Sequence, residues 1–102
     1  KKSFNIFFDN FFESLKDELP PHELTGLEVA MWQVLNNNWD GAHSLVQSIN
    51  NEMGSWIHGH LHRVEGDLEN AAYWYRRANR SYPMCTLQKE SEEIIRTITN
   101  IL

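Results

Sequence analysis

Helix-breaking residues divide this sequence into short segments, and their placement constrains the fold more than any other feature. The breaks fall at Pro20-Pro21, the Asn36-Asn37-Asn38 run, Asn50-Asn51, Gly66 and Pro83. Proline and glycine disfavour a continuing helix, and asparagine competes for its backbone hydrogen bonds. Between the breaks, apolar residues recur every three or four positions, and no alternating strand pattern occurs. The sequence therefore predicts an all-α fold of about six short helices.

We expect helices over residues 3–19, 22–35, 39–49, 52–65, 67–81 and 91–102, with residues 86–89 as a linker. The first of these is rich in phenylalanine on one side. Such a face could lie on a membrane, but its polar side is acidic where membrane-surface helices are rich in Lys and Arg. We therefore expect the phenylalanines to pack in the core.

Length and charge limit the classes of function. With 102 residues the chain suits one domain, residues 1–102, built around one modest core. A formal net charge of -5 argues against nucleic acid as a partner, and no apolar run approaches the roughly 20 residues that span a bilayer. Cys85 is the only cysteine, so no internal disulfide is expected and a cytoplasmic setting fits.

Residues 52–83 carry small, aromatic and proline residues at regular intervals: Gly59, Gly66-Asp67, Ala71, Tyr75, Ala78 and Pro83. Two antiparallel helices could cross closely where the residues are small, with Tyr75 filling the gap between them. At these spacings the segment resembles one tetratricopeptide repeat. The resemblance implies a helix-turn-helix unit of a kind that usually serves as a protein-binding scaffold.

A degenerate copy precedes this repeat at residues 23–49, where Ala30, Trp39, Ala42, Val46 and Ile49 take corresponding places. Asn37-Asn38 stands where Gly-Asp is expected, and Ala42 and Ala71 are 29 positions apart rather than the usual 34 of the repeat. We expect the first and last helices to cap the two ends of this short array. Residues 58–78, taken together with their histidines, tyrosines and arginines, also resemble a segment of an uncharacterised protein family. This second resemblance implies no activity.

In a tetratricopeptide repeat, outward positions on the first helix of the repeat, here residues 52–65, line a groove for a peptide. Those positions are Met53, Trp56, His60 and Arg63, and we hypothesise that His60 and Arg63 read an acidic group. Trp74, Arg76 and Arg77 join the candidate surface because Trp, Tyr and Arg are enriched at binding hot spots. The alternative is that the arginines pair with Glu65, Glu69 and other acidic surface groups while Trp74 packs under the last helix.

The histidines support a second hypothesis. On a helix, His58 and His62 lie one turn apart with Glu65 close by, whereas His60 points the other way. His-x-x-x-His is a workable spacing for zinc, and His43 or Glu65 could complete three ligands. The structural alternative places His58 and His62 in the core against Ala71, Tyr75 and Ala78, hydrogen bonded and without metal.

The leading prediction is a non-catalytic interaction module without a cofactor, bound to a protein or peptide or to a second copy of itself. A zinc protein or hydrolase using His58, His62 and Glu65 is one rival, although no nucleophile, phosphate-loop or paired-carboxylate signature accompanies these residues. A small-molecule binder is the other, and it would need a deep pocket lined by Trp56, Tyr75 and His62.

Overall fold

The computed structural model describes the backbone of residues 2–99 and the side-chain burial of residues 7–99. Within these residues the chain is all-α and contains no strand. The elements are α1 (Lys2–Glu13), the 3-10 turn η1 (Ser14–Lys16), α2 (Gly26–Leu35), α3 (Trp39–Gln47), α4 (Glu52–Val64), α5 (Leu68–Arg77) and α6 (Leu87–Thr99). The predicted fold class is therefore confirmed. Across residues 2–99, every helix is too short or too polar to cross a membrane.

Local sequence signals set the turns between the central helices. Asn37 and Gly66 adopt positive φ angles of 62° and 86°, which ends α2 and α4 at the predicted breaks. The next helix begins at once in each case, because Asn38 accepts a hydrogen bond from Gly41 N and Asp67 accepts one from Asn70 N. Each turn therefore joins two helices into a hairpin.

Three predicted helix boundaries are wrong, each because another local signal prevails. α2 begins at Gly26 rather than near residue 22, since Glu28 caps the turn by accepting from Thr25 N at 2.9 Å. α5 ends at Arg77 rather than near residue 81, because Asn79 takes a φ of 62°. α6 begins at Leu87 within the predicted linker, because Thr86 Oγ1 accepts from Lys89 N.

The first predicted helix is also shorter than expected. It changes to a 3-10 turn at Ser14, well before the proline pair. There Ser14 Oγ donates to Phe11 O at 2.6 Å and accepts from Trp32 Nε1 at 3.1 Å, which ties α1 to α2. Ile101 and Leu102, at the end of the helix predicted over residues 91–102, lie outside the described residues.

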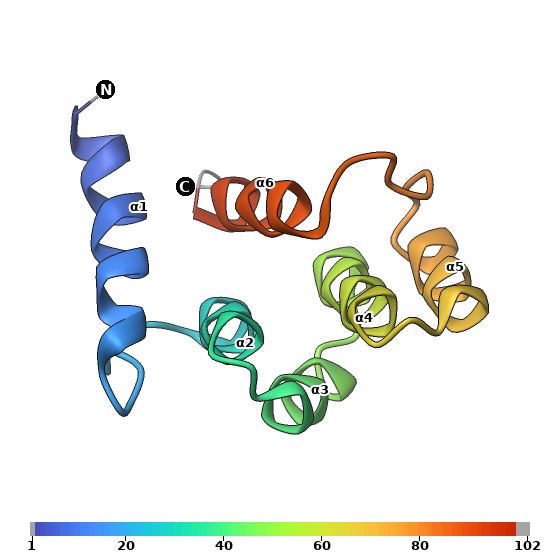
Figure 1. Cartoon of the computed structure of the whole chain (residues 1–102), viewed down its shortest axis with the longest axis horizontal. Helices are drawn as coiled ribbons and strands as arrows, with labels where there is room; N and C mark the ends of the chain where they lie inside the picture. Colours follow the sequence, from blue (N-terminus) through green and yellow to red (C-terminus); the bar gives the residue numbers. More distant parts are fainter. Residues whose placement is uncertain (1, 100–102) are drawn as a thin grey trace.

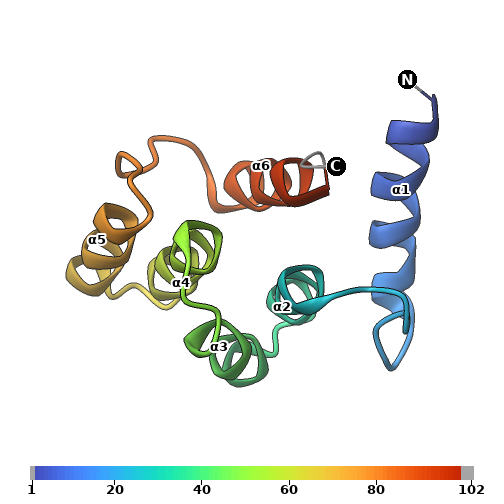
Figure 2. The same ribbon diagram turned by 180° about the vertical axis from the view of Figure 1, so that it is seen from behind.

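Successive helices pack on one another from α2 to α5 and form an arc, seen nearly end-on in Figure 1. α6 lies on the concave side of this arc across α4 and α2, and α1 stands at the α2 end; Figure 2 shows the same arrangement from behind. The expectation that the last helix caps the end of the array is wrong, because α6 packs chiefly against α4, α2 and α1. We call the surface of α2 and α4 that α6 covers the inner face.

The core lies between the inner face and α6, and continues between α4 and α5. Its most deeply buried side chains include Met31, Ile57, Leu61, Tyr75, Ile94 and Ile95. The predicted close crossing of α4 and α5 is confirmed, since a Cβ on Gly59 would lie 3.1 Å from the Tyr75 ring and 3.3 Å from Ala71 O. α4 is thus packed on several sides, which places its polar residues inside the molecule.

Candidate functional site

α4 carries five of the residues that form two candidate sites, namely Trp56, His58, His60, His62 and Arg63. Asn51 caps this helix by accepting a hydrogen bond from Gly54 N at 2.8 Å. Since successive residues of a helix turn by about 100°, His60 projects to a different side from His58 and His62. The expectation that His60 points away from the other two is confirmed, because it contacts α6 while they face α3.

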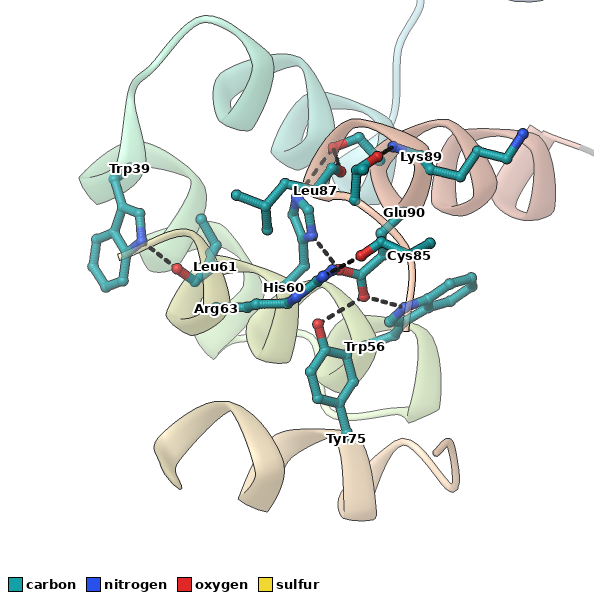
Figure 3. Close-up of polar contacts among 12 residues, drawn as sticks. Trp39, Trp56, His60, Leu61, Arg63, Tyr75, Cys85, Leu87, Lys89 and Glu90 are labelled. Atoms are coloured by element: carbon teal, nitrogen blue, oxygen red, sulfur yellow. Dashed lines mark hydrogen bonds and ion pairs between the residues drawn. The ribbon is translucent and has the colours of Figure 1, made fainter. Parts of the chain in front are cut away.

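On the inner face, four side chains donate to one carboxylate, that of Glu90 in α6, which is 1% exposed. Trp56 Nε1 lies 3.0 Å and Tyr75 Oη 2.7 Å from Glu90 Oε2. His60 Nδ1 lies 2.7 Å and Arg63 Nη1 2.9 Å from Glu90 Oε1. Figure 3 shows the four residues pointing at Glu90 from α4 and α5. We call Trp56, His60, Arg63 and Tyr75 the carboxylate pocket.

The environment of the pocket favours the ionised carboxylate. Burial alone would raise the pKa of Glu90, but hydrogen bonds from His60, Tyr75 and Arg63, together with the charge of His60, leave this pKa below its ordinary value. Burial and the bond to Glu90 raise the pKa of Tyr75, so its hydroxyl keeps the proton that it donates. The four donors therefore stabilise the ionised form of Glu90.

Further contacts hold the donors in place. Ser91 Oγ donates to Leu87 O and lies 3.1 Å from His60 Nε2, within hydrogen-bond distance of the ring. Arg63 uses its second amino group to donate to Cys85 O in the segment before α6. α6 and the chain that leads into it are thus attached to α4 at three points.

The predicted groove residues are separated by the structure. Trp56 and His60 are buried beneath α6. Arg63 is partly exposed, and Met53 is partly buried against the core. Trp74 instead stacks on His58, with ring centroids 3.7 Å apart, so it does not pack under α6 as the alternative proposed. Arg77 lies over the Trp74 ring.

The remaining arginines of that region are exposed. Arg76 is exposed on α5, and Arg80 lies 3.4 Å over the ring of Trp56. Trp56, Tyr75 and His62 do not form the common small-molecule pocket considered above. Trp56 and Tyr75 point at Glu90, whereas His62 contacts Glu65.

A second cluster lies where α4 meets α3. His43, His58 and His62 each place one ring nitrogen within 4.8 Å of the others. His58 Nε2 and His43 Nε2 are 3.0 Å apart, and His62 Nδ1 lies 2.8 Å from Glu65 Oε2. His58 and His62 are buried, and His43 is partly exposed. We call His43, His58 and His62 the histidine cluster.

Two tryptophans frame this cluster. Trp39 stacks on His43 with ring centroids 4.7 Å apart, and its indole donates to Leu61 O at 2.7 Å. Trp74 covers His58 from the other side, at an interplanar angle of 9°. Gly59 lies against Tyr75 and Ala71, whereas His58 contacts His43 and Trp74 and His62 contacts Glu65.

Burial lowers the pKa of His58 to about 4, and His43 and His62 add to the effect. Burial also lowers the pKa of His43, with a contribution from His62, while Glu65 and Asp40 act in the opposite direction. Both rings are therefore neutral at pH 7, the state in which an imidazole nitrogen can bind a metal.

Glu90 was not predicted as a site residue from the sequence, although a signal for it exists. Glu90, Ile94 and Ile98 follow one another at intervals of four, so a carboxylate stands on the apolar stripe of α6. A charged residue on a buried stripe needs hydrogen-bond partners, so this pattern indicates a paired carboxylate.

Comparison of the chain with protein-family models, with curated proteins and with solved structures found no match.

Proposed function

We propose that this chain is a helical interaction module whose inner face binds an amphipathic helix that presents a buried carboxylate. The observation that carries the proposal is the carboxylate pocket, in which four donors from α4 and α5 converge on the single group Glu90. His60 and Arg63, proposed from the sequence to read an acidic group, are two of these donors. The resemblance to tetratricopeptide repeats supports the same class of function.

The contacts of α6 define the kind of partner. Its buried residues are Glu90, Ser91, Ile94, Ile95 and Ile98, which lie along one side of the helix. A matching partner is an amphipathic helix with an acidic residue followed by branched apolar residues four, five and eight positions later. This is the helix-in-groove mode of recognition, with the carboxylate providing selectivity. α6 is the resident ligand, and a partner helix or the α6 of a second copy replaces it.

The route of the chain into α6 supports exchange. Residues 78–86 form no helix, Met84 is 98% exposed, and α6 packs chiefly on helices other than its neighbour α5. A tethered helix competes with a free one at an effective concentration in the millimolar range. We therefore expect partner binding to require either high affinity or a weakened α6. We place this module in the cytoplasm, where Cys85 stays a free thiol.

The test uses a labelled peptide of residues 84–99 and the full chain with Glu90→Gln, which weakens the hold of the resident helix. Binding is measured by fluorescence anisotropy against the peptide with Glu90 and against the same peptide with Glu90→Gln. We expect the Glu90 peptide to bind at least about tenfold more tightly, because charge-assisted hydrogen bonds are worth about 1.5–3 kcal/mol each.

Arg63→Glu in the receptor should abolish the preference for the Glu90 peptide. Arg76→Glu is the matched control, because Arg76 is exposed on α5 and lies outside the carboxylate pocket. Equal affinity for the two peptides, or a preference that survives Arg63→Glu, would refute the proposed recognition of a carboxylate.

A further inference from the structure

Independently of the carboxylate pocket, we propose that His43, His58 and His62 bind one divalent transition metal ion, zinc in the cell, between α3 and α4. The three ring nitrogens lie within 4.8 Å of one another, and two of them are 3.0 Å apart. In a tetrahedral site with Zn–N bonds of about 2.0–2.1 Å, neighbouring nitrogens are about 3.3 Å apart. On binding, side-chain rotations would have to bring the more widely spaced nitrogens to that separation.

The chemistry of the donors suits such an ion. Imidazole binds zinc, copper and nickel well, and three imidazole ligands leave a fourth position for water or a small anion. Glu65 accepts from His62 Nδ1 at 2.8 Å, which leaves Nε2 as the nitrogen that binds the metal. A carboxylate on the outer nitrogen fixes the orientation of the ring and makes it a stronger ligand. Glu65 is thus the positioning residue of the site.

The surrounding helices hold the ligands in place before any ion binds. His58 and His62 come from successive turns of α4, and His43 comes from α3. The stacked rings of Trp39 and Trp74 restrict His43 and His58, respectively. His43 is partly exposed, so an ion can enter from the edge of α3. A metal at this position links the two helical hairpins, because α3 belongs to the first and α4 to the second.

A competing ligand set shares one residue with this cluster. His62, Glu65 and Asp67 also place one ligand atom each within 4.8 Å of the others. In that set both carboxylates are exposed, and Asp67 already accepts from Asn70 N as the cap of α5. The histidine cluster is more buried, and its ligands serve no helix cap. We therefore assign the ion to the histidines.

The experiment measures zinc stoichiometry by elemental analysis on protein purified without an affinity tag, and affinity by calorimetric titration of the chelator-treated protein. Cobalt(II) replaces zinc in a parallel titration, because its visible absorption reports tetrahedral coordination. We expect one ion per chain and a loss of affinity of about 100-fold or more with His43→Gln, which removes the partly exposed ligand with the least risk to the fold.

Three further variants complete the test, and circular dichroism checks that each one folds. Glu65→Gln should weaken binding about 10–100-fold, as loss of a carboxylate behind a ligand does. Asp67→Asn and His22→Gln should leave affinity unchanged, and His22 is a matched control because its side chain is fully exposed. The proposal is overturned by protein that binds no zinc, by binding that survives His43→Gln, or by binding that Asp67→Asn abolishes.

Discussion

Replacement of Glu90 by alanine tests whether the carboxylate pocket holds α6 on the inner face. The substitution leaves four donors without their acceptor. Three of them belong to Trp56, His60 and Tyr75, which are 3%, 1% and 1% exposed. The fourth, on Arg63, lies nearer the surface and keeps its bond to Cys85 O, so water can replace part of what it loses.

A buried donor without a partner costs about 1–3 kcal/mol, and removal of one member of a buried ion pair costs about 3–5 kcal/mol. The free-energy costs of the three buried donors add, but water that enters the space left by the side chain offsets part of this sum. We therefore expect Glu90→Ala to lower the free energy of unfolding by about 3–5 kcal/mol. For a domain of this size, that loss lowers the melting temperature by about 12 °C or more.

The assay is urea denaturation followed by far-ultraviolet circular dichroism, with the linear extrapolation applied to each variant. Glu93→Ala is the matched control, because Glu93 lies on the same helix and is exposed; its effect should stay within about 0.5 kcal/mol. A loss below about 1 kcal/mol for Glu90→Ala, or an equal loss for Glu93→Ala, would refute the reasoning.

Three other predictions follow from the same structure. Because the pKa of Glu90 is lowered in the folded state, its contribution to stability is present above the unfolded value of 4.5 and is lost as the pH falls through the folded value. The stability advantage of the natural chain over Glu90→Gln, measured by denaturation, should therefore shrink as the pH falls from about 5 to about 3; an advantage that grows would contradict the assignment. Gly54→Ala would place a Cβ 2.2 Å from Ile49 O and should cost about 1–3 kcal/mol in urea denaturation, whereas Gly26→Ala, with its nearest contact at 3.5 Å, should be close to neutral. Zinc at about 100 times its dissociation constant should stabilise the fold by about 2.7 kcal/mol in a thermal scan; chelator should reverse the shift and His43→Gln should abolish it, and an equal shift in that variant would argue for another site.

The helices of the two hairpins could be located from the sequence, because the signals that break the chain between them lie in the neighbouring residues. Asn37 and Gly66 adopt the positive φ angles that their residue types favour, and Asp67, a residue type common at N-caps, caps α5. The boundary errors in α2, α5 and α6 were local too, because they concern capping and turn signals that the sequence contains, such as that of Thr86. The crossing of α4 and α5 was predictable from the spacing of their small residues.

The two candidate sites were less accessible from the sequence. The helical period of α4 separates His60 from His58 and His62, and this division was predicted. The partners of each group were harder to identify, because Glu90 lies 30 positions from His60 and His43 lies 15 positions from His58. Helical periodicity states which side a residue faces but not which distant helix covers that side.

The sequence by itself determined that this chain forms short amphipathic helices, where the breaks between the central helices fall, and which residues of α4 share a side. These properties depend on backbone preferences and on contacts within one or two turns of helix. Only the tertiary structure decided that α6 crosses α4 and α2, which brings Glu90 to its four donors. Packing against α3 likewise brought His43 to His58 and His62. These contacts depend on how whole apolar faces fit together, a property of the complete set of helices rather than of any one segment.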